Sequence, residues 1–100
     1  MQFIITALDG RDGEALDRRM AARPAHLEYA AKAIEAGKML IGGAMLDDDG
    51  KMIGSMLVVD YPSKEDVEKE YLANDPYVKG DVWRDIDIKP YKVAEVFMKK

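Results

Sequence analysis

The segment KMLIGGAMLDDDGKMIGSMLVVDY, residues 38–61, decides the fold. Residues 38–46 and 52–61 are apolar and rich in residues that favour strands. Residues 47–50, which follow the first of these segments, read DDDG, and the final Asp-Gly is a strong signal for a β-hairpin. We therefore expect two neighbouring antiparallel strands in the middle of the chain.

A helical pattern precedes this hairpin over residues 15–36. The apolar positions of its expected buried face are Leu16, Met20, Leu27, Ala30, Ala31 and Ile34. Pro24 cannot donate a hydrogen bond inside a helix but suits a first turn, so we expect a break at Arg23 and a new helix from Pro24. Gly37 is expected to end that helix in a left-handed conformation.

The outer parts of the chain supply a first strand at residues 3–8 and a second helix at 63–73, opened by Ser63 with Asp66 three residues later. A last strand is expected at residues 82–97, kinked or bulged at Pro90. The order β-α-β-β-α-β predicts an α+β, ferredoxin-like fold with a four-stranded antiparallel sheet. No linker or repeat divides the chain, so residues 1–100 are expected to form a single domain.

Two helices can cover only one face of such a sheet, yet the strand at 52–61 is apolar on both sides. One side carries Ile53, Leu57 and Val59, and the other carries Met52, Met56 and Val58. We therefore expect the uncovered face to pack against a second copy, giving a homodimer with a barrel-like pair of sheets.

The amino-acid composition argues against several classes of function. The 100 residues include 15 Lys and Arg against 19 Asp and Glu, for a net charge of −4, and no cysteine. The lack of cysteine excludes disulfides, thiol nucleophiles, thiolate metal sites and iron–sulfur clusters. An acidic chain without a basic stripe is not expected to bind nucleic acid.

Several other function classes lack support. The first apolar run ends at Asp9-Gly10, too short for a signal or a membrane span, so a cytoplasmic location and no membrane association are expected. One histidine cannot build a multi-histidine metal site, and the loop at 47–50 is too short for an EF-hand. No phosphate loop or dinucleotide motif follows a strand, so no metal and no cofactor are expected.

His26, within RPAHL at residues 23–27, is the one histidine. In the first turn of a helix starting at Pro24, free N–H groups and the helix dipole would keep the imidazole neutral and able to act as a general base. The alternative is a histidine that merely occupies a helix start.

Asp75 is the second catalytic candidate because Pro76 biases it toward an extended backbone. A carboxylate held there could accept the Nδ1 proton of His26 and leave Nε2 free to accept a proton from a substrate. The alternative is ordinary turn chemistry in Asn-Asp-Pro.

Weaker candidates for substrate binding surround this pair. Ser55 offers a hydroxyl donor or is a satisfied core serine, and the Gly42-Gly43 pair marks a close backbone approach or simply eases packing. Tyr77 and Trp83 are expected either to wall a cavity or to belong to the core. The basic residues before His26, which are Arg18, Arg19 and Arg23, either attract an anion or pair with surface acids.

Taken together, these motifs resemble the YCII-related family of small bacterial proteins. The residues that carry the resemblance, which spans almost the whole chain, are 23–27, Gly37, Gly42-Gly43, Gly54-Ser55, 75–77 and 89–91. It implies a dimeric ferredoxin-like barrel whose active site contains a histidine and an aspartate, corresponding to His26 and Asp75. A branch of the family resembles dehydrochlorinases that act on chlorinated hydroxyhydroquinones, and related barrels include lactone isomerases.

Two hypotheses follow from the sequence. The first is an acid–base enzyme of lyase or isomerase type, without a cofactor, acting on a small enolisable or phenolic compound. The second is a non-catalytic homodimer that binds a small molecule or regulates a partner through the same pocket.

Overall fold

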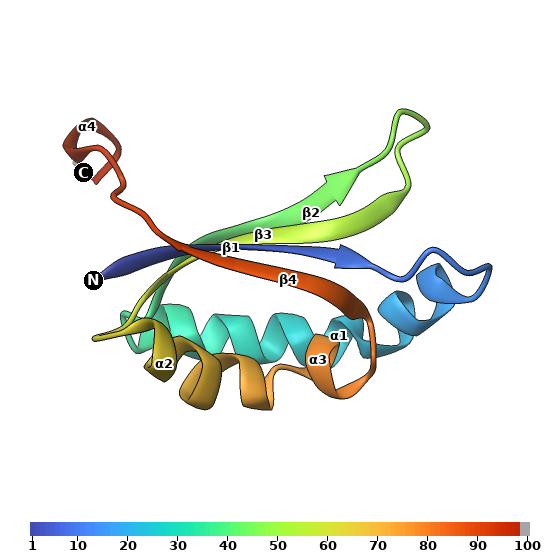
Figure 1. Ribbon diagram of the computed structural model, residues 1–100, viewed down its shortest axis with the longest axis horizontal. Helices are drawn as coiled ribbons and strands as arrows, with labels where there is room; N and C mark the ends of the chain where they lie inside the picture. The colour runs from blue at the N-terminus through green and yellow to red at the C-terminus, as the bar shows by residue number, and fades with distance from the viewer. Residues whose placement is uncertain (99–100) are drawn as a thin grey trace.

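The computed structural model describes residues 1–98 and is built on one four-stranded antiparallel sheet with the strand order β2-β3-β1-β4. The strands are β1 (Gln2–Asp9), β2 (Met39–Leu46), β3 (Met52–Asp60) and β4 (Trp83–Pro90). This is the predicted ferredoxin-like α+β fold, with the hairpin β2–β3 at one edge (Figure 1). The last two residues of the predicted domain, 99 and 100, lie outside the described residues.

The helical segments are α1 (Ala15–Glu35), α2 (Lys64–Asp66), η1 (Val67–Tyr71), η2 (Leu72–Asn74), α3 (Pro76–Lys79) and α4 (Glu95–Met98). All except α4 lie on one face of the sheet (Figure 1). The helix predicted at 63–73 begins as expected, because the Ser63 hydroxyl accepts the Asp66 N–H. It then changes from an α-helix to a π-turn in η1 and a 3-10 turn in η2.

The predicted helix break at Arg23 is wrong, because α1 continues through Pro24 without interruption. Pro24 lies on the exposed side, and it removes one backbone hydrogen bond while both halves of the helix stay packed on the same sheet. His26 therefore lies in the middle of α1. Its imidazole is therefore not close to the free N–H groups of a helix start, contrary to the prediction.

The buried face of α1 also differs from the apolar pattern. The buried residues are Ala15, Arg19, His26 and Ala30. Four of the predicted core positions are instead 40–52% exposed: Leu16, Met20, Leu27 and Ile34. The helix is thus rotated by about one residue from the expected orientation, and it turns a cation and an imidazole toward the sheet.

The core lies between the helices and the covered face of the sheet. Its strand residues include Phe3, Ile5 and Ala7 of β1 and Leu57 and Val59 of β3. The register places Asp9 at the end of the same alternation, so this carboxylate points to the helical side as well.

The last strand is shorter than predicted, since β4 ends at Pro90 and does not continue to Phe97. Pro90 is opposite Phe3 at the end of the ladder and has no N–H with which to continue it. The following segment is attached to Gln2, whose backbone and side-chain oxygens accept the N–H groups of Tyr91 and Val93. It leads to α4, on the opposite side of the sheet from α1 (Figure 1).

Both predicted glycine turns are confirmed, with φ of 74° at Gly37 and 83° at Gly50. Among residues 1–98, no helix combines the length and the apolar character that crossing a membrane requires.

Candidate functional site

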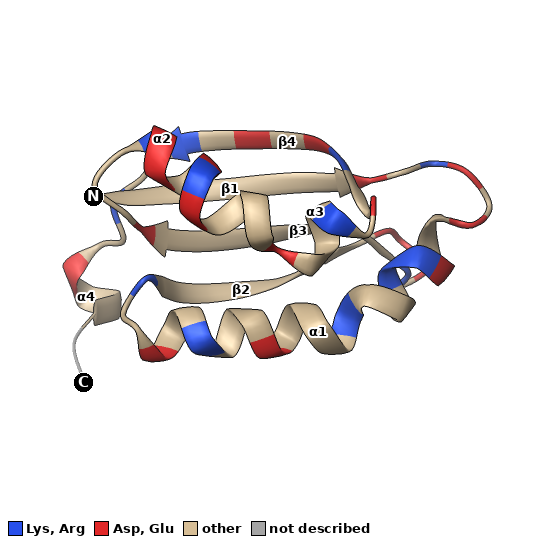
Figure 2. Ribbon diagram, turned by 90° about the horizontal axis from the view of Figure 1, so that it is seen from below, with Lys and Arg blue, Asp and Glu red and all other residues tan. Residues whose placement is uncertain are grey.

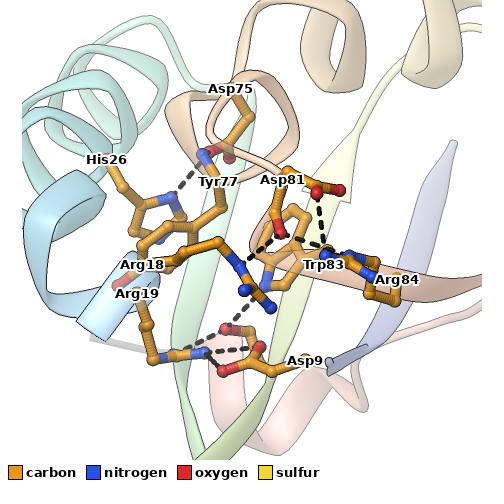
Figure 3. Close-up of polar contacts among 10 residues, drawn as sticks. Asp9, Arg18, Arg19, His26, Asp75, Tyr77, Asp81, Trp83 and Arg84 are labelled. Atoms are coloured by element: carbon orange, nitrogen blue, oxygen red, sulfur yellow. Dashed lines mark hydrogen bonds and ion pairs between the residues drawn. The ribbon is translucent and has the colours of Figure 1, made fainter. Parts of the chain in front are cut away.

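The central feature of the site is a hydrogen bond of 2.8 Å between His26 Nδ1 and Asp75 Oδ1 (Figure 3). His26 comes from the middle of α1, and Asp75 from the turn before α3. Pro76 favours the extended backbone of Asp75, with φ of −70° and ψ of 127°, and Asp75 Oδ1 also accepts the Tyr77 N–H. The carboxylate that caps α3 is therefore also the partner of the imidazole.

This contact defines the roles of the two imidazole nitrogens. An ionised carboxylate can only accept hydrogen bonds, so Nδ1 donates to Asp75. In the neutral ring, Nε2 then carries the lone pair. Asp75 is fully buried and the His26 side chain is 7% exposed, so water cannot easily replace either partner.

Aromatic rings hold the imidazole in place. The Tyr77 ring stacks on His26 with a centroid distance of 3.8 Å and an interplanar angle of 11°. Trp83 meets His26 edge-on at 5.7 Å, and the Arg19 guanidinium lies 4.7 Å from the Tyr77 ring centre. His26 is thus oriented by a stacked ring as well as by a carboxylate.

A second buried pair lies next to the first. Arg19 Nη1 lies 3.0 and 3.1 Å from the two Asp9 carboxylate oxygens, and both side chains are 3% exposed. Burial raises the pKa of Asp9 above its ordinary value, and the positive charge of Arg19 opposes that shift. This pair joins α1 to the end of β1.

The Ser55 hydroxyl is the third polar group of the site. Its oxygen accepts hydrogen bonds from Arg19 Nη2 at 2.8 Å and from Trp83 Nε1 at 3.2 Å. These two donors occupy both lone pairs, so the hydroxyl hydrogen must point elsewhere. Among residues 1–98 the Ser55 hydroxyl donates no hydrogen bond of its own.

A cavity of about 300 Å³ opens between α1 and the edge strand β2. Its polar residues are Arg19, Arg23, His26, Ser55 and Tyr77, and its apolar residues include Leu27, Ala31, Ile34, Met39 and Leu57. A Cβ at Gly42, in the floor, would lie 2.4 Å from Leu57 Cδ2, so a larger residue there would require the Leu57 side chain to move.

The structure brings most of the predicted site residues to this cavity. His26, Ser55, Arg23, Gly43 and Tyr77 line it, with Gly43 contributing backbone alone.

Three further sequence candidates, Asp75, Trp83 and Arg18, do not line the cavity. Asp75 contacts the Nδ1 side of His26, and the Trp83 indole N–H supports Ser55. The basic cluster divides, because Arg18 pairs with Asp12 at 2.7 Å, Arg19 is buried against Asp9, and Arg23 remains at the cavity.

Sequence reasoning missed two parts of the site. One is the role of Asp9, although the alternation Phe3, Ile5, Ala7, Asp9 would have placed it on the buried face. The other is Tyr71, whose buried hydroxyl, like Asp75 Oδ2, has no hydrogen-bond partner among residues 1–98. Burial, followed by the charge of Asp75, raises the pKa of Tyr71 well above its ordinary value.

Within residues 1–98, no three His, Asp or Glu side chains converge in a way that would hold a metal ion. The polar groups at the cavity are an imidazole with a carboxylate behind it, a hydroxyl and a cation. This set can move a proton and stabilise charge on an oxygen.

The fold and this site define a small ferredoxin-like α+β protein with a buried histidine–aspartate pair beside a cavity. The chain belongs to the YCII-related family, whose domain model matches residues 1–92. Protein YciI of Escherichia coli is 31% identical over 98 residues, which cover 92% of this chain and 97% of that protein.

Two further relatives have more informative names. Derivative of benzaldehyde biosynthesis cluster protein C of Emericella nidulans is 37% identical over 75 residues, covering 68% of this chain and 76% of that protein. The 5-chloro-2-hydroxyhydroquinone dehydrochlorinase of Burkholderia phenoliruptrix, in complex with 2,5-dihydroxybenzoquinone, superposes with a TM-score of 0.79 at 29% identity. That match covers 96% of this chain and 98% of the other.

Proposed function

We propose that this protein is an acid–base enzyme of lyase or isomerase type that acts on a small ring compound with an enolic or phenolic oxygen. The observation that carries the proposal is the 2.8 Å contact between the buried carboxylate of Asp75 and His26, which lines the cavity. A base fixed by a buried carboxylate is suited to removing a proton from carbon or oxygen.

In the proposed reaction, His26 Nε2 accepts a proton from the substrate, and Asp75 stabilises the imidazolium that forms. The electron pair of the broken bond moves toward a ring oxygen, where the free hydrogen of the Ser55 hydroxyl is available as a donor. In an elimination, the electrons then return to expel a leaving group as an anion. In an isomerisation, His26 returns the proton to another atom.

The relatives support the same class of substrate. The dehydrochlorinase acts on a chlorinated hydroxyhydroquinone, and the fungal relative is named for a benzaldehyde derivative. Both names refer to an oxygenated six-membered ring.

The test compares wild type with His26→Ala and Asp75→Asn, using chloride release from 5-chloro-2-hydroxyhydroquinone and exchange of the ring C–H of 2,5-dihydroxybenzoquinone in deuterium oxide. A positioned base contributes about 10²–10⁴ in rate, so each variant is expected to lose at least tenfold. The exchange assay does not require a leaving group, so it detects proton transfer in an isomerase as well.

Arg84→Gln is the matched control, because Arg84 pairs with Asp81 on the surface and does not line the cavity. Circular dichroism must show that all variants are folded. Binding of the quinone with no proton transfer by wild type would instead support the non-catalytic alternative. Unchanged exchange in His26→Ala would refute the assignment of the base.

We also propose that the face of the sheet opposite α1 packs against a second copy of the chain. That face has an apolar hollow lined by Ile41, Met56 and Val58 of the sheet and by Tyr91 and Phe97 of the C-terminal segment. Phe97 is 79% exposed, which is unusual for a large apolar side chain. Light scattering at micromolar concentration is expected to give twice the chain mass, whereas Met56→Asp is expected to give a monomer.

A further inference from the structure

The cavity beside His26 extends beyond the space that a single ring bound at its polar end would fill. Ile34 follows His26 by eight residues on α1, which corresponds to about 12 Å along a helix. On the sheet side, Ala44 lies opposite Ser55, and Met39 lies opposite Val59 four residues further along β3, a distance of about 13 Å. A single oxygenated ring at His26 leaves the far end of this space unfilled.

The two ends of the cavity differ in chemistry. The end at His26 has a hydroxyl hydrogen without an acceptor on the 2% exposed Ser55, and a cation, Arg23, whose neighbours Arg18 and Arg19 are both engaged by carboxylates. The far end is lined by aliphatic side chains and has no charged lining residue. The strand beneath it, β2, carries no charge along its length (Figure 2).

The aliphatic lining of the cavity is exposed to an unusual degree. Leu27 is 48% exposed and Ile34 is 52% exposed, although both are large apolar residues. The neighbouring small residues Ala31, Gly42 and Ala44 keep the space between α1 and β2 open. Such a surface is stabilised when another apolar group covers it.

We propose that the substrate is amphiphilic: an oxygenated, anionic ring that carries an alkyl chain, with the ring at His26 and Ser55 and the chain along Leu27, Ala31 and Ile34. Arg23 provides the complementary charge for the ring, and the uncharged far end provides the complementary surface for the chain. The inference rests on the proposed function, from which it takes the ring, and adds the substituent and its orientation.

The test measures the dissociation constants of 2,5-dihydroxybenzoquinone and of its 3-methyl, 3-ethyl and 3-butyl derivatives by calorimetry with the full chain. A fully buried methylene strengthens binding about fourfold and a half-buried one about twofold. The butyl derivative is therefore expected to bind roughly 15-fold more tightly than the parent quinone, since four carbons at about twofold each multiply to that value.

Two variants test where the alkyl chain of the ligand lies. Ile34→Ser removes part of the apolar wall, and Ala31→Leu fills the far end of the cavity. Each is expected to reduce the gain from the butyl group to threefold or less, measured as the ratio of the dissociation constants of the parent and butyl quinones in the same variant. Met20→Ser is the matched control, because Met20 is 48% exposed on the same helix but does not line the cavity.

The outcomes separate this inference from the proposed function. If the parent binds and the alkyl series shows no gain, the inference is wrong and the proposed function stands. If the gain is present and depends on Ile34 while His26→Ala still exchanges protons normally, the proposed function is wrong and the binding site stands. If no quinone of the series binds, or if Ile34→Ser alters the light-scattering mass and not the alkyl gain, the inference is overturned.

Discussion

Asp9 and Asp75 are both buried carboxylates that pair with a side-chain nitrogen on α1, yet the two pairs suit different tasks. Asp9 pairs with Arg19, whose guanidinium stays protonated at any ordinary pH. Asp75 pairs with His26, whose ring can gain and lose a proton. The first pair is a fixed charge arrangement that joins α1 to β1, whereas the second can take part in a reaction.

The largest expected effect tests the structural role of the first pair. Arg19→Met leaves Asp9 buried without a counter-charge, and loss of one partner of a buried ion pair costs about 3–5 kcal/mol. The free energy of unfolding in urea is expected to fall by that amount.

Arg18→Met is the matched control for this measurement. Arg18 pairs with Asp12 near the surface, where the two side chains are 24% and 48% exposed and solvent screens the charges, so the expected loss is much smaller than for Arg19→Met. Equal losses in the two variants would show that burial does not distinguish Arg19 from Arg18.

A smaller effect is expected from a hydrogen bond that holds the segment leading to Asp75, the carboxylate of the second pair. The Tyr29 hydroxyl donates to the Tyr71 carbonyl at 2.7 Å, at the end of the π-turn that leads to Asp75. Tyr29→Phe is therefore expected to lower the free energy of unfolding by about 1 kcal/mol. The hydroxyl of Tyr71 makes no hydrogen bond to the backbone among residues 1–98 and lies near the Asp75 carboxylate, so Tyr71→Phe is expected to lose less stability than Tyr29→Phe. The reverse order of the two variants would refute this account.

The smallest expected effect is a pH dependence in the same region. Burial, with smaller contributions from Tyr61 and Asp75, raises the pKa of Tyr29 from 10.0 to about 12. A raised pKa in the folded state means that the unfolded chain loses this proton first. The stabilisation is therefore complete below pH 10 and is lost as the pH rises to about 12. Urea unfolding between pH 9 and 11 is expected to show a shallower loss for Tyr29→Phe, and identical slopes would contradict the shift.

The sequence was sufficient to predict the order of the elements along the chain and the hairpin β2–β3, because the turn at 47–50 and the alternating apolar residues are local signals. It also singled out His26 and Asp75, which are rare or conformationally restricted residues. The predicted orientation of α1 was wrong because Arg19 and His26 are polar, and a prediction from apolar residues places polar residues on the surface. Their partners Asp9 and Asp75 lie 10 and 49 residues away in the chain, beyond the reach of any helical period.

The helix break at Arg23 failed for a related reason. Local preference opposes a proline in a helix interior, but the loss of one hydrogen bond is small beside the packing of a 21-residue helix on a sheet. The switch to π and 3-10 geometry in η1 and η2 has no signal in the residue types of 63–73.

Because the rings of His26 and Tyr77 are stacked, the proton NMR signals of His26 report on the state of the site. The chain has one histidine, so every imidazole resonance in a proton spectrum comes from this position. The phenol ring at 3.8 Å shields the carbon-bound protons of that imidazole and moves their resonances away from those of a free histidine. A molecule that enters the cavity, or a substitution that displaces Tyr77, will therefore change the chemical shifts of these imidazole protons, and no isotope label is needed to follow them.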